Sequence, residues 1–321
     1  MVAVTGATGL LGSHIIEKLL ADGIATIALH RAGGDGLPEG VIKRRADILD
    51  EVSLREAFEG ATTVIHSAAY VSFNPRWRKK IFDTNVIGTR NAINTCLQSG
   101  IKNFIHISSV AALGRTSKKT ITEESTWTKA YSTDYAESKY LAELEVYRGA
   151  EEGLTVSIVN PSTILSAAQP ERSSATLFNY VWNEERYYTD GFLNYVDARD
   201  VADVVIQLCK NPQPGEKFIL SAGHLTYLNF FSELAKRLKK RAPSINVSPA
   251  LTFWAGWGEE LWARILGREP LVTRQSARMA IQSFQYSNQK SLDSLGIRFR
   301  TAEETLDWCC EDYLRNVKPN N

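Results

Sequence analysis

The sequence predicts an α/β protein built on a Rossmann-type, doubly wound parallel sheet. A short β-branched and apolar run at 2–5 leads directly into the spaced glycines of TGATGLLG at 5–12, and an amphipathic helical pattern follows them. A second strand-like run, 25–30, comes at the distance that a βαβ unit requires. These observations predict a strand, a phosphate-binding turn and a helix, which together begin a dinucleotide-binding sheet.

The glycine turn is the predicted cofactor site. Gly6 permits a tight bend, Gly9 lets the backbone approach a pyrophosphate, and Gly12 lets the helix pack closely on the strand. The helix, expected over 10–22, adds unpaired N–H groups and a positive dipole end. A glycine-rich turn that only bends the chain is the alternative, but the flanking strand and helix favour a dinucleotide.

The composition is that of an ordinary globular protein. The 321 residues, 44% hydrophobic and 23% charged, suffice for one large domain or two unequal ones. A net charge of +1 argues against nucleic-acid binding, and no uncharged run is long enough for stable membrane insertion. The strand-like start leaves no room for a signal peptide. The four cysteines and five histidines lack metal-ligand spacing, so we expect no metal and a reduced, cytoplasmic compartment.

Arg31 ends the second strand, where an enzyme selective for NAD usually carries an acidic residue that binds the ribose 2′-hydroxyl. A guanidinium there can pair with a 2′-phosphate, so the sequence favours NADP. NAD is the alternative, because Arg31 can be a solvated strand-end residue and Asp35 can fold back toward the ribose.

Strand-like and helix-like segments continue to alternate through the first half of the chain. Small residues, Ser67 to Ala69, follow the fourth strand and leave space for a ligand at the carboxyl edge of the sheet, unless they serve only tight packing. The further strands are expected at 41–45, 63–66, 103–109 and 155–160, and the further helices at 53–59, at 78–98 and from about 133.

Tyr135 and Lys139 lie four residues apart in YAESK, so both face the same side of the expected helix. The strand before that helix ends in Ser109. A phenol beside a lysine at a nicotinamide site predicts proton transfer coupled to hydride transfer. Tyr286 and Lys290 repeat the spacing without a serine-tipped strand before them, and we interpret them as surface or domain packing.

In their order, these motifs resemble the extended short-chain dehydrogenase/reductase family of the NAD-dependent epimerase/dehydratase type. Arg31 and the segment NPS are more similar to its dihydroflavonol-4-reductase-like branch than to the sugar-nucleotide epimerases. The epimerases' aromatic-glycine-proline element is replaced here by Leu-Ser-Ala at 165–167. The matching segments are TGATGLLG at 5–12, DI at 47–48, HSAA at 66–69, NVIGT at 85–89, SS at 108–109, YAESK at 135–139 and NPSTI at 160–164.

The resemblance implies roles for particular residues. Tyr135 protonates the developing alkoxide, Ser109 holds that oxygen, and Lys139 binds the nicotinamide ribose. Asn85 helps to place the active-site helix. A strand-end hydroxyl that satisfies backbone groups is the alternative for Ser109. The expected cofactor contacts are Gly6, Thr8, Gly9, Leu10, Leu11, Gly12, Arg31, Asp47, Ile48, Ala68, Ala69, Tyr135, Lys139, Pro161 and Thr163.

The chain is expected to divide into two interleaved parts. Residues 1–164 form the dinucleotide-binding domain, and 198–221 return to it with a helix at 198–210 and a last strand at 217–220. Residues 165–197 and 222–321 form a smaller substrate-binding lobe. An apolar stripe at helical spacing in that lobe is interpreted as a core or subunit contact. It consists of Trp254, Trp257, Leu261 and Ile265.

The predicted function is NADP-dependent reduction of a ketone or aldehyde, or oxidation of the alcohol. Aromatic residues between 178 and 195 favour an apolar small-molecule substrate. A nucleotide-sugar epimerase or dehydratase is one alternative, with Arg172 and Arg186 as candidate diphosphate ligands; a non-catalytic NADP-binding sensor is another. Similar family members often pair through helices that match 78–98 and 131–152, so the resemblance makes a homodimer one possible assembly.

Overall fold

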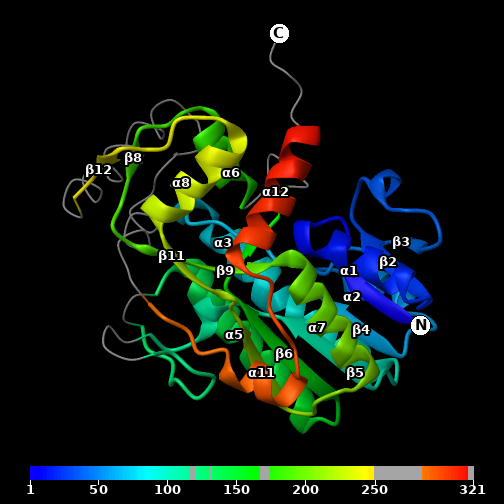
Figure 1. Ribbon diagram of the computed structural model, residues 1–321. Helices are drawn as coiled ribbons and strands as arrows, with labels where there is room; N and C mark the ends of the chain where they lie inside the picture. Colours follow the sequence, from blue (N-terminus) through cyan, green and yellow to red (C-terminus); the bar gives the residue numbers. More distant parts are fainter. Residues whose placement is uncertain (116–119, 130–131, 167–173, 249–283, 317–321) are drawn as a thin grey trace.

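The protein is built around a seven-stranded parallel sheet with the strand order β10-β6-β5-β4-β1-β2-β3 (Figure 1). The computed structural model describes residues 1–115, 120–129, 132–166, 174–248 and 284–316. The order reverses between β1 and β4, and open parallel sheets bind their ligands at the carboxyl edge beside such a reversal. The strands are β1 (Val2–Thr5), β2 (Thr26–His30), β3 (Ile42–Arg45), β4 (Thr63–His66), β5 (Asn103–Ile107), β6 (Thr155–Pro161) and β10 (Glu216–Leu220).

Helices cover both faces of this sheet, which confirms the predicted doubly wound Rossmann-type fold. Alternate residues of β1 serve the two faces: Val4 packs under α1 and α7, and Ala3 packs under α2, α4 and α5. The bounds are α1 (Leu10–Ala21), α2 (Glu51–Ala57), α4 (Gly88–Gln98), α5 (Asp134–Glu151), α7 (Ala198–Lys210) and, beside β10, α11 (Gln289–Leu295).

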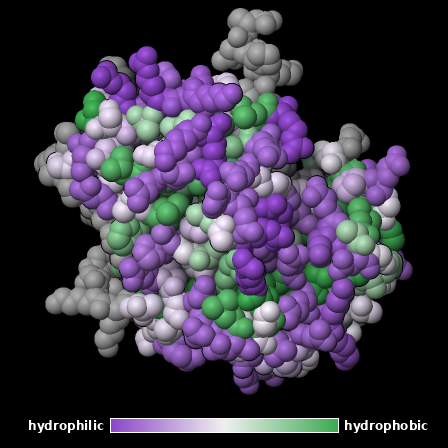
Figure 2. Space-filling view, in the orientation of Figure 1, coloured by the Kyte–Doolittle hydropathy of each residue, from purple (hydrophilic) through white to green (hydrophobic). Residues whose placement is uncertain are grey.

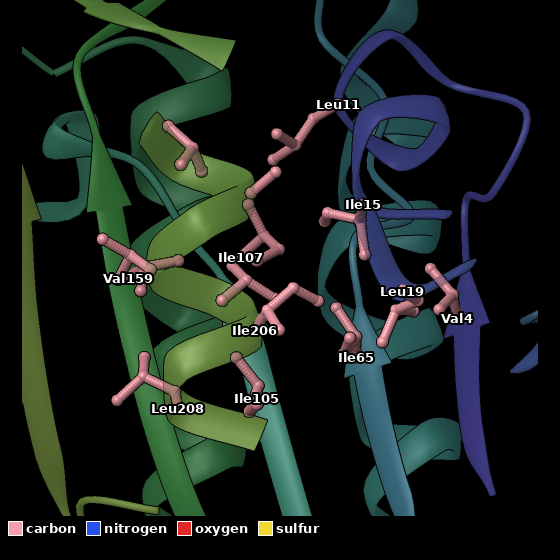
Figure 3. Packing of buried hydrophobic residues seen from close by; sticks show 14 of the residues in the cluster. Val4, Leu11, Ile15, Leu19, Ile65, Ile105, Ile107, Val159, Ile206 and Leu208 are labelled. Atoms are coloured by element: carbon pink, nitrogen blue, oxygen red, sulfur yellow. The ribbon is translucent and has the colours of Figure 1, made fainter. Parts of the chain in front are cut away.

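The core under α1 explains why that helix lies against the sheet. Leu11, Ile15 and Leu19 recur at helical spacing, and all three are buried. Figure 3 shows Leu19 beside Val4 and Ile15 near Ile65, while Leu11 extends from the start of α1 into the same cluster. Burial of each such side chain stabilises the fold by roughly 1.5–3 kcal/mol.

A second layer of structure follows β6. Three strands in the order β11-β9-β7 form a separate sheet, and β12 and β8 form a two-stranded one. A third apolar cluster packs these strands against helices from distant parts of the chain. The elements are β7 (Thr163–Leu165), α6 (Ala175–Trp182), β8 (Tyr187–Tyr188), β9 (Phe192–Asp197), β11 (Gly223–Thr226), α8 (Tyr227–Leu238), β12 (Ile245–Asn246) and α12 (Ala302–Asn316). That these form the substrate-binding lobe stays a prediction.

The predicted helix over 78–98 is not uniform. It consists of α3 (Arg78–Phe82), a π-helical turn η3 (Asp83–Ile87) and α4. The wider turn lets Asn85 direct its side chain into the protein, as described below. Single 3₁₀ turns occur at η1 (Gly34–Gly36), η2 (Pro75–Trp77) and η4 (Val110–Ala112).

Capping side chains and turns fix several of the element boundaries. α2 begins two residues before the predicted start because the Asp50 carboxylate accepts a hydrogen bond from the Val52 N–H (3.0 Å). Thr133 caps α5 by accepting from the Ala136 N–H (3.1 Å). β5 ends at Ile107 rather than at 109, because the following residues turn into η4.

The surface in the orientation of Figure 1 is mainly hydrophilic, with hydrophobic residues in scattered patches (Figure 2). In the part of the chain that the structure describes, no helix combines the length and the apolar character needed to cross a membrane. All four cysteines are free thiols.

Candidate active site

The glycine turn has the backbone geometry that the sequence predicts. Gly6 adopts a left-handed φ of +67°, and a Cβ there would lie 2.7 Å from the Ala68 nitrogen. A Cβ at Gly12 would overlap the carbonyl oxygen of Gly6. Gly9 is the N-cap of α1 and has no side chain that could occupy the helix N–H groups. The turn therefore fits a pyrophosphate that approaches the backbone closely.

The other residues expected at the cofactor follow the carboxyl ends of successive strands. Arg31 follows β2 and is exposed, and Ala68 follows β4 and donates its N–H to the Thr5 hydroxyl (3.2 Å). The Asp47 carboxylate, after β3, accepts from the Leu49 N–H (3.0 Å). These positions lie along one edge of the sheet, next to the glycine turn.

The residues expected to contact the cofactor differ in whether their side chains are exposed to a ligand. The side chains of Leu11 and Ile48 are buried in the core, so only their backbone groups can meet a ligand. Ala69 is exposed. Pro161 ends β6 and Thr163 begins β7, so this pair lies where the chain leaves the large sheet.

Ser109 and Tyr135 come together at the end of β5. The Ser109 oxygen accepts from the Ala111 N–H (3.1 Å), and the Ser109 hydroxyl is near enough to the Tyr135 phenol to influence its pKa. Burial raises the pKa of that phenol, while the Ser109 hydroxyl and the charge of Arg115 oppose the rise. The ring of Phe73 stands edge-on to Tyr135 at a centroid distance of 6.2 Å.

Lys139 lies one turn along α5 from Tyr135 and is buried, with an exposed fraction of 2%. Its ammonium donates to the Ile107 carbonyl (2.7 Å). Burial lowers the pKa of Lys139 to about 8, and the charge of Glu143 opposes this change. At neutral pH the group therefore carries a proton, which it can use as a hydrogen-bond donor.

A buried polar network supports this end of β5. The Glu143 carboxylate accepts from the Ser108 hydroxyl (2.5 Å) and from the Asn160 amide (2.6 Å). The same Asn160 amide donates to the Ser109 carbonyl (3.0 Å). Strands β5 and β6 and helix α5 are thereby tied together around the serine.

Asn85 connects the π turn to the active-site helix. Its side chain donates to the Tyr70 carbonyl (3.1 Å) and to the Ser138 hydroxyl (2.9 Å), and it accepts from the Tyr70 N–H (2.7 Å). Ser138 in turn donates to the Tyr135 carbonyl (2.7 Å). Asn85 thus fixes the first turns of α5 relative to the segment after β4.

A chain of hydrogen bonds links the glycine turn to Asn85. Thr5 Oγ1 lies 2.9 Å from Nδ1 of His66, whose Nε2 lies 3.1 Å from Thr89 Oγ1. The Thr89 hydroxyl donates to the Asn85 carbonyl (2.7 Å), so Nε2 of His66 must be the donor to Thr89 and Nδ1 must accept from Thr5. Burial lowers the pKa of His66 to about 3, in keeping with this neutral tautomer.

Sequence reasoning did not identify Arg115, His66 or Glu143. Glu143 reaches the serine segment through Ser108 and Asn160, and His66, although it stands in the HSAA segment, joins Thr5 to Thr89. These contacts depend on the fold, and no sequence spacing reveals them. Tyr286 pairs with Ile121 in an isolated β-bridge, and Lys290 forms an ion pair with Glu216 (2.5 Å), as expected for packing.

Two further expectations concern parts of the second half. Arg186 is exposed, whereas Arg172 and the stripe at 254–265 lie outside the described residues. Among the residues that the structure describes, no cluster of three or more His, Cys, Asp or Glu side chains could hold a metal ion.

Comparison with known proteins identifies the family. The family model described as "NAD dependent epimerase/dehydratase family" matches residues 2–221. The chain belongs to this family. It is therefore an NAD(P)-dependent enzyme of the extended short-chain dehydrogenase/reductase type.

Individual relatives are consistent with this assignment. "Sterol demethylase protein B" of Methylococcus capsulatus is 31% identical over 256 residues, which cover 77% of each chain. "Putative dihydroflavonol 4-reductase" of Synechocystis is 28% identical and covers 94% of this chain and 91% of its own. The crystal structure of gox2253 superposes with a TM-score of 0.83 at 27% identity and covers 98% of both chains.

Proposed function

We propose that the protein is an NADP-dependent oxidoreductase that reduces an apolar ketone or aldehyde, or oxidises the corresponding alcohol. The observation that carries the proposal is the hydrogen bond from Lys139 to the Ile107 carbonyl (2.7 Å). It holds α5, which carries Tyr135 one turn before Lys139, against the end of β5, and Ser109 follows that strand end. A hydroxyl, a phenol and an ammonium at this edge form a proton-transfer site beside the predicted cofactor turn.

The chain supplies groups that fit the cofactor. Its pyrophosphate would lie at the glycine turn and the first N–H groups of α1, and Arg31 is free to turn toward a 2′-phosphate because it is exposed. Lys139 would hold the nicotinamide ribose. When bound, NADPH supplies the hydride that reduces the carbonyl carbon.

The proton chemistry belongs to the side chains. Tyr135 gives its phenolic proton to the alkoxide oxygen that develops during reduction. Ser109 donates a hydrogen bond to the same oxygen, and this bond strengthens as negative charge appears. The positive charge of Lys139 stabilises the phenolate that Tyr135 becomes. The Phe73 ring beside Tyr135 favours a substrate with an apolar group next to the carbonyl.

A substrate screen tests the proposal. NADPH oxidation is followed with a panel of aliphatic and aromatic ketones and aldehydes, first with the wild-type protein and then with Tyr135→Phe. Loss of the acid should lower kcat by roughly 100-fold or more. Tyr147→Phe is the matched control on the same helix and should retain activity, because Tyr147 lies three turns away from Tyr135.

The alternatives give different readouts. An epimerase or dehydratase would convert a nucleotide-linked sugar without net NADPH consumption, and a sensor would bind NADPH without turnover of any carbonyl compound. Unchanged turnover in Tyr135→Phe would refute the assignment of the acid.

A further inference from the structure

Phe73 is an aromatic residue that lies against the proposed acid. The centres of the Phe73 and Tyr135 rings are 6.2 Å apart and the ring planes are inclined by 76°, which is the edge-to-face contact of two touching rings. Both residues are only half-buried, so each keeps some surface that a ligand can meet. Phe73 therefore forms one wall of the space beside the phenol.

Hydrogen bonds on both sides of Phe73 hold its backbone in place. Before it, the Asn85 side chain accepts from the Tyr70 N–H (2.7 Å) and donates to the Tyr70 carbonyl (3.1 Å). After it, the buried Asn74 side chain accepts from the Arg76 N–H (3.1 Å) and begins the η2 turn. The position of the Phe73 ring is thus set by the chain itself.

The segment that carries Phe73 is also attached to α5 around Tyr135. Arg78, at the start of α3, forms ion pairs with Asp134 (3.4 Å) and Glu137 (3.7 Å), which lie on either side of the tyrosine in sequence. At the other end, Asn85 holds the same helix through the hydrogen bond described above. Because the wall and the acid are anchored to one helix, Phe73 has little freedom to move away from the phenol.

A carbonyl compound that takes its proton from Tyr135 must lie close to this wall. Its oxygen has to be about 3 Å from the phenolic oxygen, so one of the two groups on the carbonyl carbon comes within van der Waals reach of Phe73. A hydrogen atom or a methyl group can lie against a flat ring at that distance. A branched group needs volume that the ring already fills.

We propose that Phe73 is a specificity-determining residue, which limits the smaller of the two groups on the carbonyl carbon to hydrogen or methyl. The substrates are then aldehydes and methyl ketones, and their larger apolar group extends away from Phe73. The inference rests on the proposed function in taking Tyr135 as the group that binds the carbonyl oxygen.

Two ketones that differ in one group test the size limit. Acetophenone carries a phenyl and a methyl group, whereas isobutyrophenone carries a phenyl and an isopropyl group. Each ketone is titrated calorimetrically into the protein saturated with NADP⁺, or with NAD⁺ if that is the nucleotide it binds. The oxidised cofactor has no hydride to give, so the titration measures Kd without turnover. The wild-type protein should bind acetophenone at least about tenfold more tightly than isobutyrophenone.

Phe73→Ala should bring the ratio of the two Kd values to about one by improving the binding of isobutyrophenone, and Phe73→Leu should give an intermediate ratio. A merely structural defect would weaken the binding of both ketones together. Phe299→Ala is the matched control, because Phe299 is also half-buried but packs into the apolar core under α1, on the face of the sheet opposite α5. Its ratio should equal that of the wild type.

Should Phe73→Ala fail to fold, Phe73→Leu carries the test. An unchanged ratio in the folded Phe73 variants would overturn the inference. So would a wild-type protein that binds both ketones equally well or binds neither, since the inference requires that a methyl ketone be accepted and a branched one disfavoured.

The two proposals fail separately. Size discrimination that depends on Phe73, in a protein that reduces no carbonyl compound, would overturn the proposed function and leave the role of Phe73 in binding intact. Carbonyl reduction that requires Tyr135, together with an unchanged ratio in Phe73→Ala and Phe73→Leu, would overturn the role of Phe73 alone.

Discussion

Lys139 and Glu143 lie one turn apart on the buried side of α5, and the negative charge of Glu143 favours the protonated form of Lys139. Burial lowers the pKa of Lys139 to about 8, and Glu143 limits that decrease. The carboxylate also accepts hydrogen bonds from Ser108 and Asn160. The Glu143 side chain therefore both influences the charge of Lys139 and binds Ser108, which precedes Ser109 at the end of β5.

Replacing Glu143 with glutamine should lower the pKa of Lys139 further, because the opposing negative charge is removed. A larger fraction of molecules then carries a neutral lysine near neutral pH, so kcat/KM should fall there and recover as the pH is lowered. Glu145→Gln is the matched control, since Glu145 pairs with Arg90 and Arg148 at the surface. Superimposable pH profiles for wild type and Glu143→Gln would contradict this coupling.

Arg31→Ala should weaken NADPH binding by about tenfold or more, because a charge-assisted hydrogen bond is worth roughly 1.5–3 kcal/mol. NADH affinity should change little, since NADH lacks the 2′-phosphate. Calorimetric titration of both nucleotides measures the two affinities. Arg55→Ala is the control and should change neither affinity. It removes an arginine of α2 whose guanidinium donates to the Gln98 side chain at the end of α4. Equal losses for both nucleotides would show that Arg31 does not read the 2′ position.

Gly12→Ala should displace α1, because a Cβ at this position overlaps the backbone of Gly6. We expect the free energy of unfolding to fall by roughly 1–3 kcal/mol and NADPH binding to be lost. Gly36→Ala is the control: its Cβ would meet nothing within 4 Å. Urea unfolding and nucleotide titration of both variants provide the measurement. An unaffected Gly12→Ala protein would mean that the turn is looser than described.

Thr89→Val should cost about 1–3 kcal/mol of stability, because it leaves the Asn85 carbonyl and the His66 N–H without their partner. Thr305→Val is a matched control, since the Thr305 hydroxyl is buried without a hydrogen-bond partner among the described residues. That change should be neutral or stabilising. Equal unfolding free energies for the two variants would argue against a continuous donor chain through His66.

Stability should decrease in acid because of His66 and His106, which stack at 5.7 Å on adjacent strands. Burial, with the charge of Lys139, lowers the pKa of His66 to about 3 and that of His106 well below its usual value. The unfolded chain binds these protons near pH 6.5, so the free energy of unfolding should fall by roughly 1 kcal/mol per pH unit for each histidine below that pH.

His106→Leu should remove about half of this acid slope. Neither ring nitrogen of His106 has a hydrogen-bond partner among the described residues, so the substitution breaks no hydrogen bond there. Urea unfolding from about pH 7 to about pH 5 gives the slope. An unchanged slope would assign acid sensitivity to other groups.

Local sequence patterns predicted most of the first half of the fold. The glycine turn, the six strands from β1 to β6 and the pairing of Tyr135 with Lys139 each follow from periodicity or from a short spacing. The return of β10 to the large sheet was also predicted correctly. In these cases the interacting groups are near neighbours in sequence, or, for every strand except the exposed β3, the pattern is strongly apolar.

Features that depend on distant partners were not predictable. The π turn at Asn85 exists because its side chain reaches Tyr70 and Ser138, which no periodicity reveals. Strand β9 lies in an aromatic stretch that fits a helix or a strand equally well, and only its pairing with β7 and β11 decides. Arg115 resembles any loop arginine until residues from the far end of the chain cover it.

The two hydrogen bonds between Ile121 and the segment 285–287 have a consequence for recombining this chain with its relatives. A chimaera joined after residue 221, where the family match ends, would inherit Arg115 and Ile121 from one parent and Tyr286 from the other. Exchanging residue 121 and its neighbours together with 284–287 keeps the two Ile121 hydrogen bonds within a single parent. Crossover libraries built on this boundary should yield folded hybrids mainly when both segments come from the same parent.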